Sequence, residues 1–70
     1  MVLNFVILSY YNHVTGICDV TVLNRFESKE LAIEFFRTNQ SMFVDSNPVY
    51  FIVAEEHEDG FKDLNGDWIV

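Results

Sequence analysis

The hydrophobic residues of this chain are grouped mainly in short runs with the length and composition of β-strands. Residues 2–11, 17–25 and 49–54 are rich in β-branched and aromatic side chains, a composition typical of strands. Residues 61–64 are a fourth, shorter candidate, and Asn65-Gly66 after them is a two-residue hairpin signal that would return residues 67–70 to the sheet. Between the first two strands, residues 12–16 predict a hairpin loop.

One segment has the period of a helix instead. Ser28 is the predicted N-cap of a helix over about residues 29–40, because its hydroxyl can accept from the amides of the first turn. The apolar side of this helix is predicted to pack on a sheet, and it carries Leu31, Ala32, Phe35 and Phe36. Pro48 then restores an extended backbone ahead of the third strand.

The element order β-β-α-β-β predicts a single α+β domain over residues 1–70. A right-handed crossover through the helix places the third strand beside the first. We therefore expect one antiparallel sheet of four to five strands in the spatial order 2-1-3-4, with the helix packed on one face.

The central strands of this predicted sheet are apolar on both faces, although a single helix covers only one. We expect seven side chains to face the helix: Leu3, Phe5, Ile7, Val20, Val22, Phe51 and Val53. That leaves an open apolar face made of Val6, Leu8, Tyr10, Leu23, Tyr50 and Ile52. Monomers rarely expose a patch of this size, so we expect a second copy or a target protein to cover it. The alternative is that a terminal segment of the chain folds over it.

The net charge of the chain favours some classes of binding partner over others. Eleven Asp and Glu against four Lys and Arg give a net charge of −7. This balance disfavours direct binding to nucleic acid or to an anionic membrane and favours basic protein surfaces. Solubility alone would also account for it.

The acidic residues concentrate after the third strand. Six carboxylates lie within thirteen residues: Glu55, Glu56, Glu58, Asp59, Asp63 and Asp67. Residues 55–59 are expected to leave the strand as an acidic segment that presents a row of negative charge, as a DNA duplex does with one charge per ~1.7 Å. A solvated loop without a partner is the alternative. Residues 63–67 resemble the opening of an EF-hand calcium loop, but Trp68 stands where that loop needs glycine, so we expect a plain hairpin and no metal.

Catalysis is not expected. The one cysteine, Cys18, is expected to be a small core residue, and no positioned base accompanies it. A chain of 70 residues leaves little room for both a core and a cleft. No cofactor is implied. The first residues lack the basic region of a signal peptide, so the cytoplasm is the expected compartment.

These features together predict a small, acidic, non-enzymatic protein-binding module. In its small size, strong acidity, β-β-α-β-β plan and lack of a catalytic signature, the chain is similar to many phage and mobile-element proteins that block host factors. These include anti-CRISPR proteins, other anti-defence inhibitors and nucleic-acid mimics. We therefore expect an inhibitor or modulator that occupies a basic surface of a target protein. The alternative is a structural or assembly subunit that homodimerises through the open sheet face.

Overall fold

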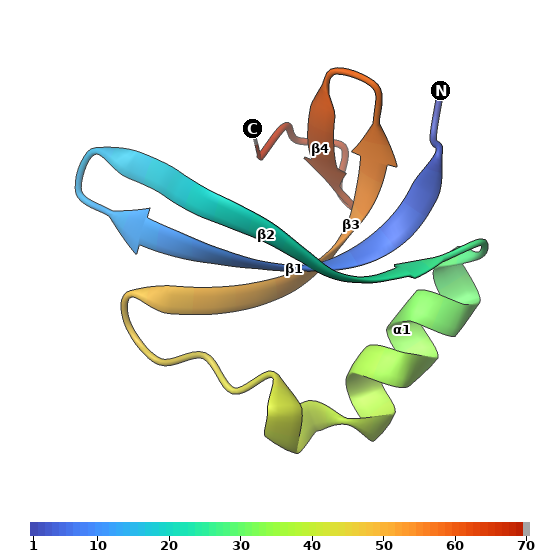
Figure 1. Cartoon of the computed structure of the whole chain (residues 1–70), viewed down its shortest axis with the longest axis horizontal. Helices are drawn as coiled ribbons and strands as arrows, with labels where there is room; N and C mark the ends of the chain where they lie inside the picture. Colours follow the sequence, from blue (N-terminus) through green and yellow to red (C-terminus); the bar gives the residue numbers. More distant parts are fainter. Residues whose placement is uncertain (70) are drawn as a thin grey trace.

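A computed structural model describes residues 1–69 and contains one helix packed on one sheet (Figure 1). The described elements are β1 (Asn4–His13), β2 (Gly16–Phe26), α1 (Lys29–Thr38), a 3-10 turn (Gln40–Met42), β3 (Val49–His57) and β4 (Gly60–Asp63). The strands form a single antiparallel sheet in the order β2-β1-β3-β4. The predicted fold class, element order and strand order are confirmed.

Helix α1 begins as predicted and ends slightly early. The Ser28 hydroxyl accepts a hydrogen bond from the Leu31 amide at 3.1 Å, which is the N-cap interaction. At the other end, the Asn39 amide and side chain both donate to the Phe35 carbonyl, and this closes the helix at Thr38. Leu31 was expected to pack on the sheet, but it is 54% exposed because it lies at the margin of the apolar stripe.

Strand β3 is longer than the sequence predicts. It runs to His57, so the acidic segment 55–59 is largely strand, with only Glu58 and Asp59 in the turn before β4. Pairing explains the extension, since Glu55 lies opposite Lys62 and Glu56 opposite Phe61 on β4. The return segment 67–70 was expected as a strand. Of its described residues, only Trp68 pairs, through one isolated bridge to Lys62.

The core on the helix side of the sheet is rich in aromatic rings. Ile7, Ala32, Phe43 and Val53 are buried there, and five phenylalanines are among the partly buried residues around them. Phe43 follows the 3-10 turn and stacks on Phe36 with ring centroids 5.2 Å apart. The expected helix-facing positions of β1 and β3 are therefore confirmed.

The opposite face is also covered, which contradicts the expected open face. Val6, Leu8 and Ala54 are fully buried there. The sheet curls, and its concave side receives the C-terminal segment between the β1–β2 and β3–β4 hairpins (Figure 1). The residues packed over the buried cluster are Val20, Val22, Ile52, Phe61 and Ile69. The expectation that Val6 and Leu8 are left open is thus wrong, because side chains of β2, β3 and β4 cover them together with Ile69 of the C-terminal segment.

The register of β2 explains the other misplaced residues. Val22 lies opposite Leu8, so Val22 and Val20 face the concave side and not the helix. The register shifts between Ile7 and Leu8 and again between Ser9 and Tyr11. Each shift interrupts the two-residue alternation from which faces were assigned. Leu3 precedes β1 and is 48% exposed instead of facing the helix.

Candidate functional site

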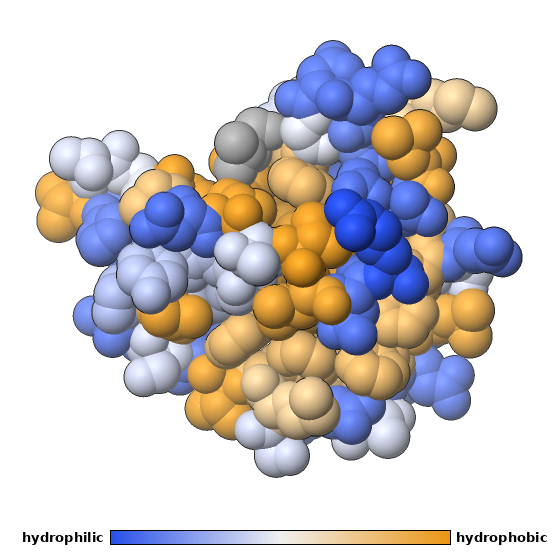
Figure 2. Space-filling model, in the orientation of Figure 1, coloured by the Kyte–Doolittle hydropathy of each residue, from blue (hydrophilic) through white to orange (hydrophobic). Residues whose placement is uncertain are grey.

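The acidic residues of the β3–β4 hairpin lie at one end of the molecule. Gly60, with φ of 154°, permits the tight turn that presents the exposed side chains of Glu58 and Asp59. In Figure 2, hydrophilic residues gather over the tip of this hairpin. The structure shows what the predicted carboxylates contact.

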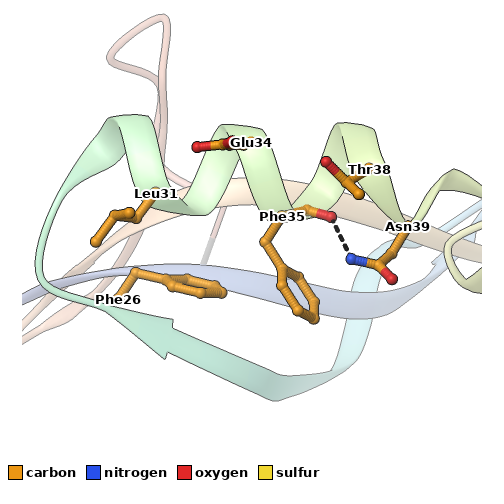
Figure 3. A pocket seen from close by; sticks show the side chains of 6 residues that line it. All are labelled: Phe26, Leu31, Glu34, Phe35, Thr38 and Asn39. Atoms are coloured by element: carbon orange, nitrogen blue, oxygen red, sulfur yellow. Dashed lines mark hydrogen bonds between the residues drawn. The ribbon is translucent and has the colours of Figure 1, made fainter.

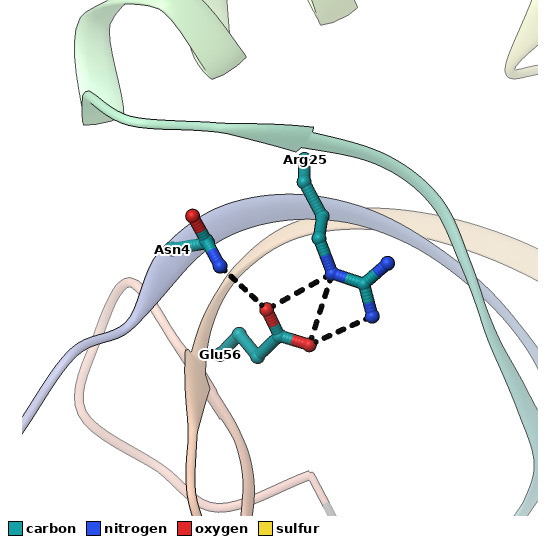
Figure 4. A network of polar contacts seen from close by, with 3 residues as sticks. All are labelled: Asn4, Arg25 and Glu56. Carbon is teal, nitrogen blue, oxygen red and sulfur yellow. Dashed lines mark hydrogen bonds and ion pairs between the residues drawn. The ribbon is translucent and has the colours of Figure 1, made fainter.

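Glu56 is neutralised inside the chain. Its carboxylate accepts from Nε and Nη2 of Arg25, with the shortest contact at 3.0 Å, and from the amide of Asn4 at 3.0 Å (Figure 4). The hydrogen bonds from Arg25, followed by the one from Asn4, hold the pKa of Glu56 below its usual value. This cluster joins β1, β2 and β3, so Glu56 stabilises the fold and is not available to a partner.

Glu55 is also occupied. Its Oε1 lies 2.9 Å from Nε2 of His57, two residues further along the same strand. The His57 ring meets Trp68 edge-on at 5.3 Å, and Nζ of Lys62 lies 4.9 Å from the centre of the same indole. The indole therefore contacts one side chain from each strand of the β3–β4 hairpin.

Asp63 serves the following turn. Its Oδ1 accepts from the amides of Asn65 and Asp67, both at 2.9 Å, and Gly66 takes a φ of 92° within the turn. The spacing that resembles a calcium loop is thus used for backbone capping. Among residues 1–69, no group of three or more His, Cys, Asp or Glu side chains is placed to hold a metal ion.

Three of the six candidate carboxylates have no hydrogen-bond or ion-pair partner in the described part of the chain. Within the described residues, the side chains of Glu58, Asp59 and Asp67 make no hydrogen bond or ion pair. Trp68 is 54% exposed and lines a shallow depression with Glu58 and Asp59. We call Glu58, Asp59, Asp67 and Trp68 the acidic hairpin surface. It combines carboxylates that have no in-chain partner among residues 1–69 with a large aromatic ring, and Lys62 and Met1 line the same depression.

Sequence reasoning missed four residues that line the depression: Met1, His57, Lys62 and Trp68. Met1 is 96% exposed. The single tryptophan of the chain, set beside Asp67, was the available signal, because Trp is enriched at the energetic centres of protein interfaces. The position of Met1 depends on strand pairing and left no sequence signal.

The six apolar candidates do not form one patch. Val6 and Leu8 are buried, while Tyr10, Tyr50 and Ile52 are half-buried. The rings of Tyr10 and Tyr50 stack at 6.0 Å on the paired strands, and burial raises the pKa of the Tyr10 phenol. Leu23 is 43% exposed, on edge strand β2.

Cys18 was expected in the core and is exposed instead. It lies near the far end of the β1–β2 hairpin, where the structure has no layer to cover it. Desolvation and the negative charge of Asp19 raise the pKa of its thiol, the opposite of what a nucleophile needs.

Comparison of the chain with protein-family models, curated proteins and solved structures finds no match. Across residues 1–69, no helix has both the length and the apolarity needed to cross a membrane.

Proposed function

We propose that this chain is a non-enzymatic protein-binding module that places its acidic hairpin surface on a basic surface of a target protein. The observation that carries the proposal is the contrast among neighbouring carboxylates. Glu55 and Glu56 are bound within the chain, whereas Glu58, Asp59 and Asp67 keep their charge beside an exposed tryptophan. An exposed tryptophan is a side chain enriched at the energetic centres of interfaces, and the carboxylates beside it supply charge complementarity to a basic partner.

Inhibition or modulation of the target is the finer proposal. A rigid hairpin carrying several negative charges can occupy a groove that otherwise holds phosphates, which is how a nucleic-acid mimic of the anti-defence type acts. The holding of Trp68 by His57 and Lys62 supports this proposal, because a preorganised surface loses less entropy on binding.

We also propose a cytoplasmic location. Cys18 is an exposed free thiol, and such thiols persist where the environment is reducing. The homodimer alternative loses its main support, because Val6 and Leu8 are covered within the chain. It is retained as an outcome of the experiment below.

The test is affinity capture from a bacterial lysate with three forms of the immobilised protein. The first is the wild type, the second is E58K/D59K, and the third is E27K/E30K, which changes the net charge equally on the exposed surface around the start of α1. Glu55 and Glu56 are left unchanged because their contacts support the fold.

We expect a specific protein to be captured by the wild type and by E27K/E30K and to be lost with E58K/D59K. Capture should also fall in about 1 M salt, where the Debye length is about 3 Å. Equal loss in both variants would show that only overall charge matters. Salt-insensitive capture, or sedimentation of the pure protein as a dimer, would contradict the proposal.

A further inference from the structure

The two edges of the sheet differ in how their backbone groups are hydrogen-bonded. On the outer side of β3, the Phe51 amide donates to Oδ1 of Asp45 at 3.0 Å, and Ser46 and Val49 exchange backbone hydrogen bonds of 2.8 and 2.6 Å. Strand β4 pairs with the remainder of that side. Strand β2 is the other edge, and in residues 1–69 its backbone hydrogen bonds lead only to β1.

An unpaired edge strand offers a row of N–H and C=O groups to another chain. Part of β2 is protected, because Asp19 has a φ of 53° and a register shift breaks the ladder beside it. The stretch Asn24–Phe26 is regular, since it pairs residue by residue with Ile7, Val6 and Phe5. That short stretch is the part of the edge open to strand addition.

A groove lies beside this stretch, between β2 and α1 (Figure 3). Its volume is about 410 Å³, and its lining residues are Phe26, Leu31, Glu34, Phe35, Thr38 and Asn39. The rings of Phe26 and Phe35 contact each other at 5.4 Å, and Asn39 fixes the helix end by donating to the Phe35 carbonyl at 2.9 Å. The groove is thus preformed, apolar and large enough for one side chain.

We propose that β2 and α1 form a second binding site, which takes a short extended segment of another protein. The segment pairs with Asn24–Phe26 and inserts one large apolar side chain between Leu31 and Phe35. This is strand addition next to a side-chain pocket, in which backbone hydrogen bonds give affinity and the pocket gives specificity. Because the regular stretch is short, backbone pairing and the anchor side chain are both required for binding.

Charge selects the occupant. Glu34 is the one charged residue among those lining the groove, and the chain carries a net charge of −7. Two copies that each carry a net charge of −7 repel one another, which disfavours a second copy as the occupant. The fitting occupant is therefore a segment with Lys or Arg beside its apolar anchor. This site is separate from the acidic hairpin surface and does not depend on it.

The probe is the synthetic peptide Lys-Thr-Val-Phe-Lys with blocked ends, titrated into the ¹⁵N-labelled protein. We expect amide shifts to move at Asn24–Phe26 and along Leu31–Asn39, with the hairpin turn at Glu58 unaffected. The variant Leu31→Asp should weaken binding about tenfold or more, since the anchor loses its apolar wall. Leu31 is exposed, so this variant should keep the fold. Val44→Asp, a change at an exposed apolar residue outside the groove, is the matched control.

Two further peptides test the geometry and the charge. Replacing Val of the peptide by Pro should abolish binding, because proline removes the N–H needed for the strand. Exchanging both Lys for Glu should weaken binding to the wild type, and Glu34→Lys should reverse that preference. Equal binding of the proline peptide, shifts confined to other residues, or absence of shifts at millimolar peptide would overturn the proposal. So would a concentration-dependent dimer that Leu31→Asp dissociates, because the edge would then belong to a second copy.

Discussion

The two faces of the sheet are buried to the same depth by different means. On one face, α1 and the segment after it bring phenylalanine rings over Ile7 and Val53. On the other, the curled sheet closes over Val6 and Leu8 with smaller aliphatic side chains, Phe61 and Ile69. The helix thus covers only one face of the sheet. On the other face, Ile69 packs over the buried cluster together with residues of the curled strands.

The second face also carries a polar connection. Arg25 lies opposite Val6, and Asn4 opposite Glu56, so the cluster of these polar residues continues the concave face at its margin. An apolar run on both sides of a strand therefore predicts that both sides are buried. It does not predict that another molecule provides the burial.

The largest effect is expected at the centre of each face. Ile7→Ala and Leu8→Ala should each destabilise the fold by about 2–5 kcal/mol, because both side chains are fully buried and the cavities cannot close completely. Chemical denaturation at neutral pH measures both. The two losses should be comparable. If Leu8→Ala costs much less than Ile7→Ala, the concave face is open in solution and the comparison fails.

A domain of this size has little stability to lose, so milder variants are needed beside these. Ile7→Val removes one methyl group on the helix side and should cost about 0.5–1.5 kcal/mol. Val6→Ala removes two methyl groups on the concave side and should cost more than Ile7→Val. Both should remain folded.

Much of the fold follows from the sequence for identifiable reasons. The strands and helix have strong and different periods, Ser28 marks the helix start, and the crossover rule fixes the strand order. The face of Val20 and Val22 does not follow, because a register shift leaves no clear residue signature. The cover over Leu8 was expected only as an alternative, since Ile69 joins that cluster through the path of a short terminal segment.

Truncation of Ile69 tests how much the C-terminal segment stabilises the concave face. Ile69→Ala should destabilise the protein by about 1–2 kcal/mol, because a partly buried side chain contributes less than a fully buried one. Thermal and chemical unfolding measure the loss. Val44→Ala, a change at an exposed apolar residue, should stay within about 0.5 kcal/mol of the wild type. An Ile69→Ala variant as stable as the wild type would show that the C-terminal segment does not pack on the concave face.

The acidic hairpin could be placed from the sequence, but the contacts of its carboxylates could not. The run of Glu and Asp begins inside β3 at Glu55 and continues through the turn before β4. Which of those carboxylates keep their charge depends on cross-strand partners: Arg25 reaches Glu56 from a strand 31 residues earlier. Such a contact requires the sheet register, and periodicity does not supply it.

The smallest effect concerns the polar margin of the concave face. Glu56→Gln keeps the shape of the side chain but loses the charge that Arg25 binds, so stability at neutral pH should fall by less than in the two core variants. The hydrogen bonds from Arg25 and Asn4 lower the pKa of Glu56, and this fixes the sign of the pH effect. The contribution is complete above the ordinary glutamate pKa of about 4.3, and it is lost as the pH falls through the lowered pKa of Glu56. The difference between wild type and Glu56→Gln should therefore be present at neutral pH and shrink in acid, as denaturation at the two pH values would show.

Glu58→Gln, at an exposed carboxylate without an in-chain partner among residues 1–69, should show neither the loss nor the pH dependence. If both variants behave alike, the cluster of Asn4, Arg25 and Glu56 contributes nothing to the concave face, and only its apolar residues hold it together.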